Sequence, residues 1–204
     1  LPSLPAVARA ARLIGGPAIR AMATAGGNLF APAPYGDLAV PLLALDARVE
    51  LSGPSGQQQL PLEAFLAQRP PINHGRPPSN SAALVTALRV PRAQGQTAYL
   101  KLARRGANAA SVVAVAIRVT RDDAGACAEA RIALGAAGPR ALRARTAEAA
   151  LVGQPFDRQR IAAAAEAAMS ECEPCTDALA SAWYRRRMVG VYVRRALESL
   201  LAGD

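Results

Sequence analysis

The chain has 204 residues, of which 51% are hydrophobic, so it is long enough for one substantial domain or two small ones with a buried core. Its net charge of +9 is supplied by dispersed arginines without interleaved aromatic residues, which argues against nucleic-acid binding and favours an acidic protein surface as partner. No apolar run reaches the roughly 18–20 residues of a membrane span, and three cysteines provide no disulfide framework, so we expect a reduced, cytoplasmic protein.

The first quarter of the chain is predicted to contain short helices separated by turns. Residues 6–14 have helical spacing, and the sequence Gly15-Gly16-Pro17 ends that helix. Residues 19–29 have too little side-chain volume for an ordinary core element. Asp37 is placed to cap a further short helix over residues 38–45.

A hairpin and a loop are predicted next. Residues 48–52 and 57–60 flank a Gly-Pro-Ser-Gly turn and are expected to pair as strands. A short helix over 62–68 precedes a loop over 69–81, which contains His74, the only histidine. Residues 83–90 are expected to form a strand that Pro91 ends.

The second half is predicted to be an antiparallel sheet followed by helices. The expected strands are residues 97–103, 111–120 and 126–136. The expected helices are residues 146–152, 157–171 with Asp157 as N-cap, and a last helix from Asp177 or Ser181 to residue 201. The fold class is therefore α+β: an α/β subdomain over residues 1–93, then a three-stranded antiparallel sheet with a helical layer over 94–204.

The cysteines and the histidine do not predict a metal site. Cys172 and Cys175 form a C-x-x-C pair, but the third cysteine, Cys127, is distant in sequence, and His74 is not at a ligand spacing. A structural zinc site needs four ligands. We expect two incidental thiols at a helix end and no metal.

The segment Thr24-Ala25-Gly26-Gly27-Asn28 has the composition of a ligand-binding turn. Adjacent glycines let a backbone approach a ligand closely and expose successive N–H groups, which suits pyrophosphate oxygens. Thr24 and Asn28 add polar side chains on either side. The segment is not a G-x-G-x-x-G motif in a βαβ unit, which disfavours a Rossmann site. A tight turn without a ligand remains the alternative for these residues alone.

Its context resembles the FAD-binding (medium) subunit of the xanthine dehydrogenase and carbon monoxide dehydrogenase family of molybdenum hydroxylases. Residues 19–29 are similar to the second flavin-binding segment of that subunit, and they precede Pro34-x-x-Asp37-Leu38-Ala39-x-Pro41, as in the family. Residues 99–105 are similar to its Tyr-x-Lys-x-x-x-Arg stretch, which opens the C-terminal domain. Residues 135–143 and 184–197 resemble later landmarks of that domain, so the likeness runs in order from about residue 13 to 197.

The resemblance implies an FAD site without catalytic side chains. The implied contacts are Ile14, Thr24, Ala25, Gly26, Gly27, Asn28, Asp37, Val85 and Lys101. The five residues from Thr24 to Asn28 would line the pyrophosphate and approach the flavin, and Asp37 would accept hydrogen bonds from the ribityl or adenosine side. Ile14 would touch the cofactor, and the Val85 backbone would meet the flavin edge. Lys101, the only lysine, would lie near the pyrimidine end and stabilise negative charge on the reduced flavin.

The resemblance also implies an oxidoreductase subunit within a heterotrimer. A substrate would be oxidised at a molybdopterin cofactor on a large partner, and electrons would pass through 2Fe-2S clusters on a small partner. FAD on this chain would then transfer them to NAD, oxygen or another acceptor. The alternative is a non-catalytic interaction subunit that keeps the fold but has lost FAD.

Three departures from the family accompany the resemblance. The family's first flavin-binding segment, a Gly-Gly-Thr or Gly-Asn-Thr turn, is expected to belong to a lobe before Leu1, so we expect about a third of the usual subunit to be missing. The carbon monoxide dehydrogenase branch places an aromatic beside the flavin where this chain has Asn108 and Ala109, which disfavours that branch. No iron–sulfur cysteine set is present.

The last helix carries two arginine groups, Arg185-Arg186-Arg187 and Arg194-Arg195. Helical spacing predicts a shared face for Tyr184, Met188, Val191 and Arg195, which leaves Arg185, Arg186 and Arg194 able to point elsewhere. We expect these arginines to form ion pairs within the chain or contacts with partner subunits.

Overall fold

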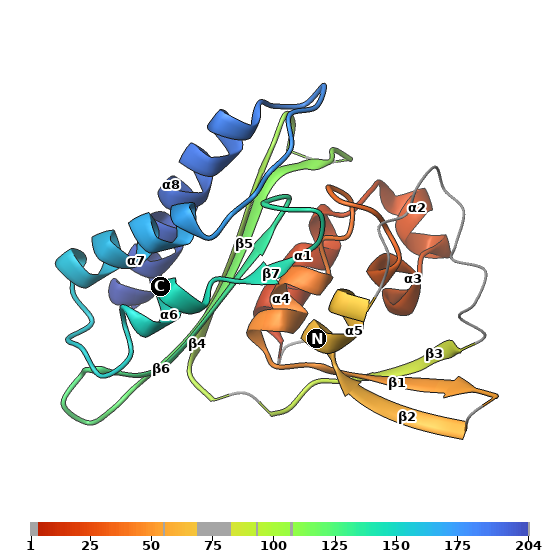
Figure 1. The fold of residues 1–204 in the computed structure, drawn as a ribbon, viewed down its shortest axis with the longest axis horizontal. Coiled ribbons are helices and arrows are strands. Elements are labelled where there is room, and N and C mark those ends of the chain that lie inside the picture. Colours follow the sequence, from red (N-terminus) through yellow and green to blue (C-terminus); the bar gives the residue numbers. More distant parts are fainter. Residues whose placement is uncertain (1–3, 55, 69–82, 93, 107, 204) are drawn as a thin grey trace.

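The computed structural model describes residues 4–54, 56–68, 83–92, 94–106 and 108–203. The strands form two antiparallel sheets, a short one with the order β2-β1-β3 and a long one with the order β4-β5-β6-β7. Figure 1 shows α7 and α8 on one face of the long sheet and α1 and α4 on the other. The arrangement is α+β, as the sequence predicts.

Within its described residues, the first part contains five short helices and the small sheet. Its helices are α1 (Pro5–Leu13), α2 (Pro17–Met22), α3 (Ala25–Leu29), α4 (Ala39–Ala44) and α5 (Leu62–Gln68), and its strands are β1 (Arg48–Gly53), β2 (Gly56–Pro61) and β3 (Leu84–Arg89). Proline at the first helical position begins α1 and α2, since its fixed φ suits a helix and its missing N–H has no partner there. The predicted hairpin is confirmed, with Gly53 opposite Gly56. The predicted loop over 69–81, with His74, lies outside the described residues.

The second part contains the long sheet and three helices. The strands are β4 (Gln96–Ala103), β5 (Ser111–Arg121), β6 (Cys127–Gly135) and β7 (Leu142–Arg143), and the helices are α6 (Arg145–Ala149), α7 (Arg158–Ser170) and α8 (Ala182–Leu201). The prediction of three strands is wrong, because β7 pairs with Ala133 and Leu134 as a fourth. Two residues are too few to produce an alternating pattern in the sequence.

The alternation of valine and alanine in β5 divides the core into two layers. Val113, Val115 and Ile117 are fully buried against α7 and α8. Ala114 and Ala116, on the opposite face of the strand, belong to a second core with α1, α4 and Tyr99. Small side chains on this face let α4 approach the sheet closely, so the first part of the chain packs directly on the second.

Gly135 sits at the closest point of that contact. A Cβ atom added to Gly135 would lie 2.5 Å from Cγ2 of Val40 on α4 and 3.3 Å from Cβ of Ala114. We expect Gly135→Ala to destabilise the fold by about 1–3 kcal/mol, because the packed neighbours must move. Gly106→Ala is the matched control, since nothing lies within 4 Å of its added Cβ. Urea unfolding of both variants measures the difference, and equal stabilities would contradict the close contact.

A network of ion pairs also joins the two parts. Asp46, just after α4, accepts hydrogen bonds from Arg118 (2.9 Å) and Arg131 (3.0 Å) on the long sheet and from Arg143 (2.9 Å) on β7. Arg143 also pairs with Glu148: Oε1 of Glu148 lies 2.5 Å from Nε of Arg143. Three of the dispersed arginines are therefore paired with carboxylates of the chain itself, which lowers the number of arginines that could bind an external anionic partner.

The last helix buries one of its arginines. Arg185, Val189 and Val193 are buried on α8, whereas Tyr184 is 39% exposed. Arg185 can be buried because its Nη2 atom makes two hydrogen bonds, of 2.8 and 2.7 Å, with the carboxylate of Asp177. The expected ion pair within the chain is thus present for this arginine. Ser181 is the N-cap of α8, and its hydroxyl accepts from the N–H of Tyr184.

Candidate functional site

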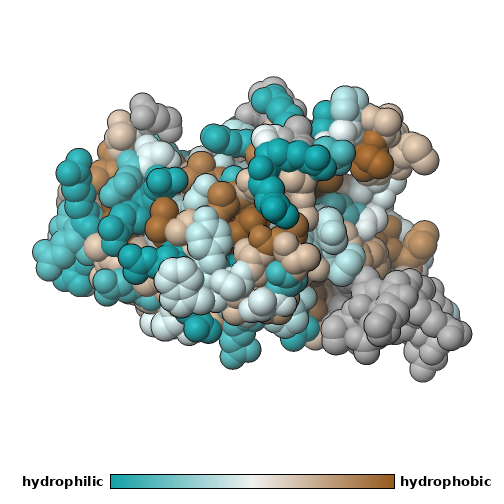
Figure 2. Space-filling model, turned by 90° about the horizontal axis from the view of Figure 1, so that it is seen from above, coloured by the Kyte–Doolittle hydropathy of each residue, from teal (hydrophilic) through white to brown (hydrophobic). Residues whose placement is uncertain are grey.

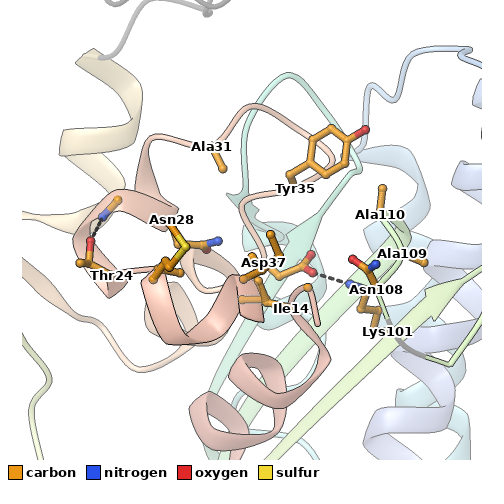
Figure 3. A pocket seen from close by; sticks show the side chains of 15 residues that line it. Ile14, Thr24, Asn28, Ala31, Tyr35, Asp37, Lys101, Asn108, Ala109 and Ala110 are labelled. Carbon is orange, nitrogen blue, oxygen red and sulfur yellow. Dashed lines mark hydrogen bonds and ion pairs between the residues drawn. The ribbon is translucent and has the colours of Figure 1, made fainter. Parts of the chain in front are cut away.

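A cavity of about 600 Å³ opens where the first part of the chain meets the start of the long sheet. Its walls come from the turn after α1, from α2 and α3, from the segment before α4, and from β4 with residues 108–110. Figure 3 shows Thr24 and Asn28 on one side, Lys101 and Asn108 on the other, and Asp37 between them. The volume is within the usual range for sites of small molecules and cofactors.

The structure brings six of the nine predicted contacts to this cavity: Ile14, Thr24, Gly27, Asn28, Asp37 and Lys101. The other three predicted residues, Ala25, Gly26 and Val85, do not line it. Gly26 faces β3 instead, where an added Cβ would lie 3.5 Å from the side chain of Val85. Gly26 and Val85 are therefore neighbours of each other rather than of the cavity.

A buried ion pair forms the floor of the cavity. Nζ of Lys101 lies 2.6 Å from Oδ2 of Asp37, and each side chain is only 5% exposed. The Lys101 ammonium also donates to the carbonyl of Leu13 at 3.3 Å. The hydroxyl of Ser111 donates to the other Asp37 oxygen, Oδ1, at 2.5 Å. A fixed positive charge is thus held at the cavity by a carboxylate whose two oxygens both have donors.

The prediction that Asp37 caps the following helix is wrong. The N-cap of α4 is Leu38, without a side-chain hydrogen bond. The N–H of Leu38 instead donates to the side-chain oxygen of Asn28 at 3.0 Å. Because the Asn28 side chain already accepts from the N–H of Leu38, the Asp37 carboxylate is not needed as a cap. It lies instead against Lys101 on β4 and Ser111 on β5.

The Gly-Gly-Asn segment is a turn of helix rather than an open loop. Thr24 is the N-cap of α3, and its hydroxyl accepts a hydrogen bond of 2.9 Å from the N–H of Gly27. An added Cβ at Gly27 would lie 2.9 Å from that same hydroxyl oxygen, so a larger residue would displace the capping hydroxyl. Two glycines in a short helix look unfavourable in sequence, and the cap compensates for them locally.

Sequence reasoning missed three apolar side chains at the edge of the cavity. Ile19 and Tyr35 are each 56% exposed and Met22 is 87% exposed, yet all three line it. Ile19 and Met22 belong to residues 19–29, which carry the family resemblance, so their place at the site could have been predicted from that segment. Asn108 and Ala109 also line the cavity, at the positions where the sequence lacks an aromatic residue.

Tyr99 does not line the cavity, but it lies buried near the Asp37 carboxylate. Tyr99 and Lys101 point to the same face of β4 because side chains alternate along a strand. The Tyr99 hydroxyl is buried and has no hydrogen-bond partner among the described residues. Burial raises the pKa of Tyr99 far above its usual value, and the nearby Asp37 carboxylate raises this pKa further. Tyr99 therefore stays neutral and adds no charge next to the pair of Lys101 and Asp37.

The cysteines lie apart from this cavity. Cys127 and Cys172 are buried and Cys175 is exposed, and all three are free thiols. Burial raises the pKa of the Cys127 and Cys172 thiols, which opposes formation of the nucleophilic thiolate. In the described part of the chain, no three His, Cys, Asp or Glu side chains gather as metal ligands. Within those same ranges, no helix is both long and apolar enough to cross a membrane.

Families of known proteins match both parts of the chain. Residues 2–93 match the family described as FAD binding domain in molybdopterin dehydrogenase, and residues 98–200 match the CO dehydrogenase flavoprotein C-terminal domain. The carbon monoxide dehydrogenase medium chain of Hydrogenophaga pseudoflava is 32% identical over 98% of this chain and 68% of its own length. A putative xanthine dehydrogenase FAD-binding subunit of Escherichia coli is 29% identical over 98% of this chain and 67% of its own.

A solved structure agrees in its fold. Carbon monoxide dehydrogenase from Hydrogenophaga pseudoflava superposes with a TM-score of 0.86 at 34% identity, covering 98% of this chain and 68% of that one. The chain thus spans about two thirds of the length of these relatives. The sequence has Asn108 and Ala109 where the carbon monoxide dehydrogenase branch has an aromatic residue, and we took this as a sign against that branch. The comparisons do not separate the branches, because the chain is similar to members of both.

Proposed function

The chain belongs to the FAD-binding medium subunits of the molybdenum hydroxylase family, and we propose that its cavity holds the flavin end of FAD for electron transfer. The relatives are chains of multi-subunit oxidoreductases, which implies small and large partner subunits for this chain. Electrons would enter from iron–sulfur clusters on the small partner and leave to NAD, oxygen or another acceptor. The large partner would hold the molybdopterin cofactor.

The observation that carries the proposal is the pairing of an apolar rim with a charged floor. Ile19, Met22 and Tyr35 expose apolar surface around one cavity, where a planar ring system would cover it. Beneath them stands the buried pair of Lys101 and Asp37. A flavin has an apolar dimethylbenzene side and a polar pyrimidine side, so the residues present fit this group. FAD, when bound, accepts and releases electrons singly or in pairs.

Each polar residue then has a distinct task. Lys101 would place its ammonium beside the pyrimidine side, where it stabilises the negative charge of the reduced ring. Asp37 would hold Lys101 in place, with Ser111 fixing the second carboxylate oxygen. The family resemblance assigns Asp37 a hydrogen bond to the ribityl or adenosine side, but both of its oxygens already have donors. We therefore propose Asp37 chiefly as a positioning residue for Lys101.

The segment from Thr24 to Asn28 would support the chain of the cofactor. Gly27 and Asn28 line the cavity and leave its wall free of large side chains at this point. Ala25, Gly26 and Val85 remain proposed contacts from the family resemblance, and they would require the cofactor to extend beyond the cavity, toward β3. Ile14 would supply apolar contact from the turn after α1.

A charge on the apolar rim tests the proposal. Met22→Glu should weaken FAD binding about tenfold or more, because the ring would have to desolvate a carboxylate. The fold should be unaffected, since Met22 is 87% exposed. Val152→Glu is the matched control, an apolar residue that is 43% exposed and does not line the cavity.

The measurement uses the protein purified with its partner subunits. Visible absorption gives the flavin content, and titration of the deflavinated complex with FAD gives the affinity. A complex that assembles but is colourless and takes up no FAD would contradict the proposal and favour the interaction subunit without flavin. Equal FAD affinities of Met22→Glu and Val152→Glu would show that the flavin does not bind in this cavity.

A further inference from the structure

Arg185 lies buried between α8 and the long sheet, with only 1% of its surface exposed. The other four arginines of α8 are exposed. Seen from above in Figure 2, hydrophilic residues gather over the end of the molecule that α7 and α8 form. A buried ion pair seldom gives more stability than a well-packed apolar pair of the same size. Stability alone therefore does not account for the burial of Arg185, and the groups that its guanidinium holds indicate its role.

The guanidinium of Arg185 joins the segment before α8 to the start of β5. Its Nη2 atom donates to both carboxylate oxygens of Asp177, at 2.8 and 2.7 Å. Its Nη1 atom donates to the carbonyls of Ser111 (3.2 Å) and Val112 (2.7 Å), the first two residues of β5. One nitrogen of the guanidinium is thus held by a carboxylate, and the other is committed to two backbone carbonyls.

These two carbonyls belong to a β-bulge. In the pairing of β4 with β5, Leu102 lies opposite Val113 and Ala103 lies opposite Ser111. Val112 is therefore the extra residue, without a Cα partner in this register. One extra residue moves the side chains beyond it to the other face of the sheet, because side chains alternate along a strand. Bulges are frequent next to functional sites, where they re-aim a side chain.

The side chains at the start of β5 show this change of face. Val112 and Val113 are adjacent in sequence, yet both belong to the core that lies against α7 and α8. With regular alternation, Ser111 would point to the same side as Val113. The hydroxyl of Ser111 instead donates to Oδ1 of Asp37 at the floor of the cavity. The bulge thus turns Ser111 from the helix face of the sheet to the cavity face.

We propose that Arg185 is a positioning residue for the floor of the cavity, and that it acts by holding this bulge in β5. Without the guanidinium, the carbonyls of Ser111 and Val112 would lose these donors, and a regular register that turns Ser111 away from the cavity would be favoured. Arg185 does not line the cavity, so its effect passes through Ser111 and Asp37 to the ammonium of Lys101. The effect on a flavin rests on the proposed function, whereas the aim of Ser111 does not.

A double-mutant cycle on stability tests whether Arg185 aims Ser111. Ser111→Ala deletes the hydroxyl but keeps the carbonyl that Arg185 holds. In the wild type it should lower the folding equilibrium constant about tenfold, because a hydrogen bond to a charged group is lost. In Arg185→Met the hydroxyl is already turned away, and the same deletion should change the constant less than about twofold. Urea unfolding of the full chain measures these constants, and equal effects of Ser111→Ala in the two backgrounds would overturn the proposal.

Two further variants separate positioning from packing. Arg185→Lys keeps a positive charge for Asp177 but lacks the planar fork that reaches the carboxylate and both carbonyls together. It should reduce the effect of Ser111→Ala in the same direction, and it replaces Arg185→Met where that variant does not fold. Val193→Ala is the control, a buried residue about 12 Å further along the axis of α8. It should lower stability and leave the effect of Ser111→Ala unchanged, and an abolished effect would overturn the proposal.

The flavin potential of the assembled complex is a readout that a purely structural role would not move. Ser111→Ala leaves the Asp37 charge less compensated, so the equilibrium constant for flavin reduction should fall about tenfold, which is ~30 mV for a two-electron couple. Arg185→Met should cause the same fall, and the double variant no further one. Arg187→Met removes an exposed charge from the same helix and should leave the constant within about twofold.

The two measurements fail separately. Additive shifts of the potential for Ser111→Ala and Arg185→Met would overturn the proposal, because the two residues would then act independently. Unchanged potentials in both variants, together with coupled stabilities, would refute the place of the flavin and support the positioning of Ser111.

Discussion

Lys101→Met should destabilise the fold by about 3–5 kcal/mol and make the bound flavin harder to reduce. The methionine leaves the Asp37 carboxylate buried, 5% exposed, with Ser111 as its remaining side-chain partner. An unpaired buried charge is among the costliest single changes in a folded protein. The flavin potential should become more negative by about 30 mV for each ~1.4 kcal/mol of charge stabilisation lost.

A double variant separates the structural effect from the functional one. Lys101→Met with Asp37→Leu removes both charges, and replacing a buried ion pair by apolar residues is often close to neutral for stability. We therefore expect most of the stability to return while the flavin potential remains low. Urea unfolding and a spectroelectrochemical titration measure the two quantities. A wild-type potential in the double variant would show that the Lys101 ammonium does not act on the flavin.

Asp177→Asn should destabilise the fold by about 3 kcal/mol, because Arg185 is 1% exposed and loses its carboxylate partner. Asparagine keeps an oxygen that can accept from the N–H groups of Leu179 and Ala180, so the turn before α8 is preserved. Asp123→Asn, at an exposed aspartate outside the ion pairs, is the control and should change stability by less than about 0.5 kcal/mol. Equal losses in the two variants would exclude the ion pair as the cause.

The same pair predicts the direction of a pH effect. Burial alone would raise the pKa of Asp177, but hydrogen bonds from Arg185, Leu179 and Ala180 outweigh it, so the pKa lies below its ordinary value of 3.8. A carboxylate with a lowered native pKa contributes stability above the unfolded pKa and loses it as the pH falls through the native one. The stability difference between wild type and Asp177→Asn should be complete at neutral pH and shrink on acidification below about pH 4. A difference that grew toward low pH would contradict this sign.

Local patterns predicted most of the secondary structure. The alternating valines and alanines of β5 and the capping residues Asp157 and Ser181 are signals contained within a few residues. The hairpin of β1 and β2 is likewise set by its glycine turn. The strand β7 escaped prediction, because two residues pair only where Ala133 and Leu134 offer them a sheet edge. The short helix α3 escaped it because the Thr24 cap offsets its glycines.

The candidate site was predicted because several segments resemble those of one family in the same order along the chain. The ion pair within the site, in contrast, depends on a contact between segments that are distant in sequence. Sequence by itself determined which residues carry charge and polarity: a single lysine, an aspartate before α4 and a threonine-to-asparagine segment of small residues. Only the tertiary structure decided that Lys101 and Asp37, 64 positions apart, pair in a buried place. Burial and pairing are properties of packed surfaces and not of local sequence, because both depend on what the rest of the chain excludes from water.

The last helix shows the same limit. Its sequence shows many arginines but does not indicate that one of them is buried, since an arginine is ordinarily an exposed residue. Arg185 lies inside because Asp177 and the carbonyls of Ser111 and Val112 accept hydrogen bonds from both of its terminal nitrogens, and this burial turns Trp183 outward. The helix itself was therefore determined by local sequence, and the surface that it presents was decided by one buried ion pair.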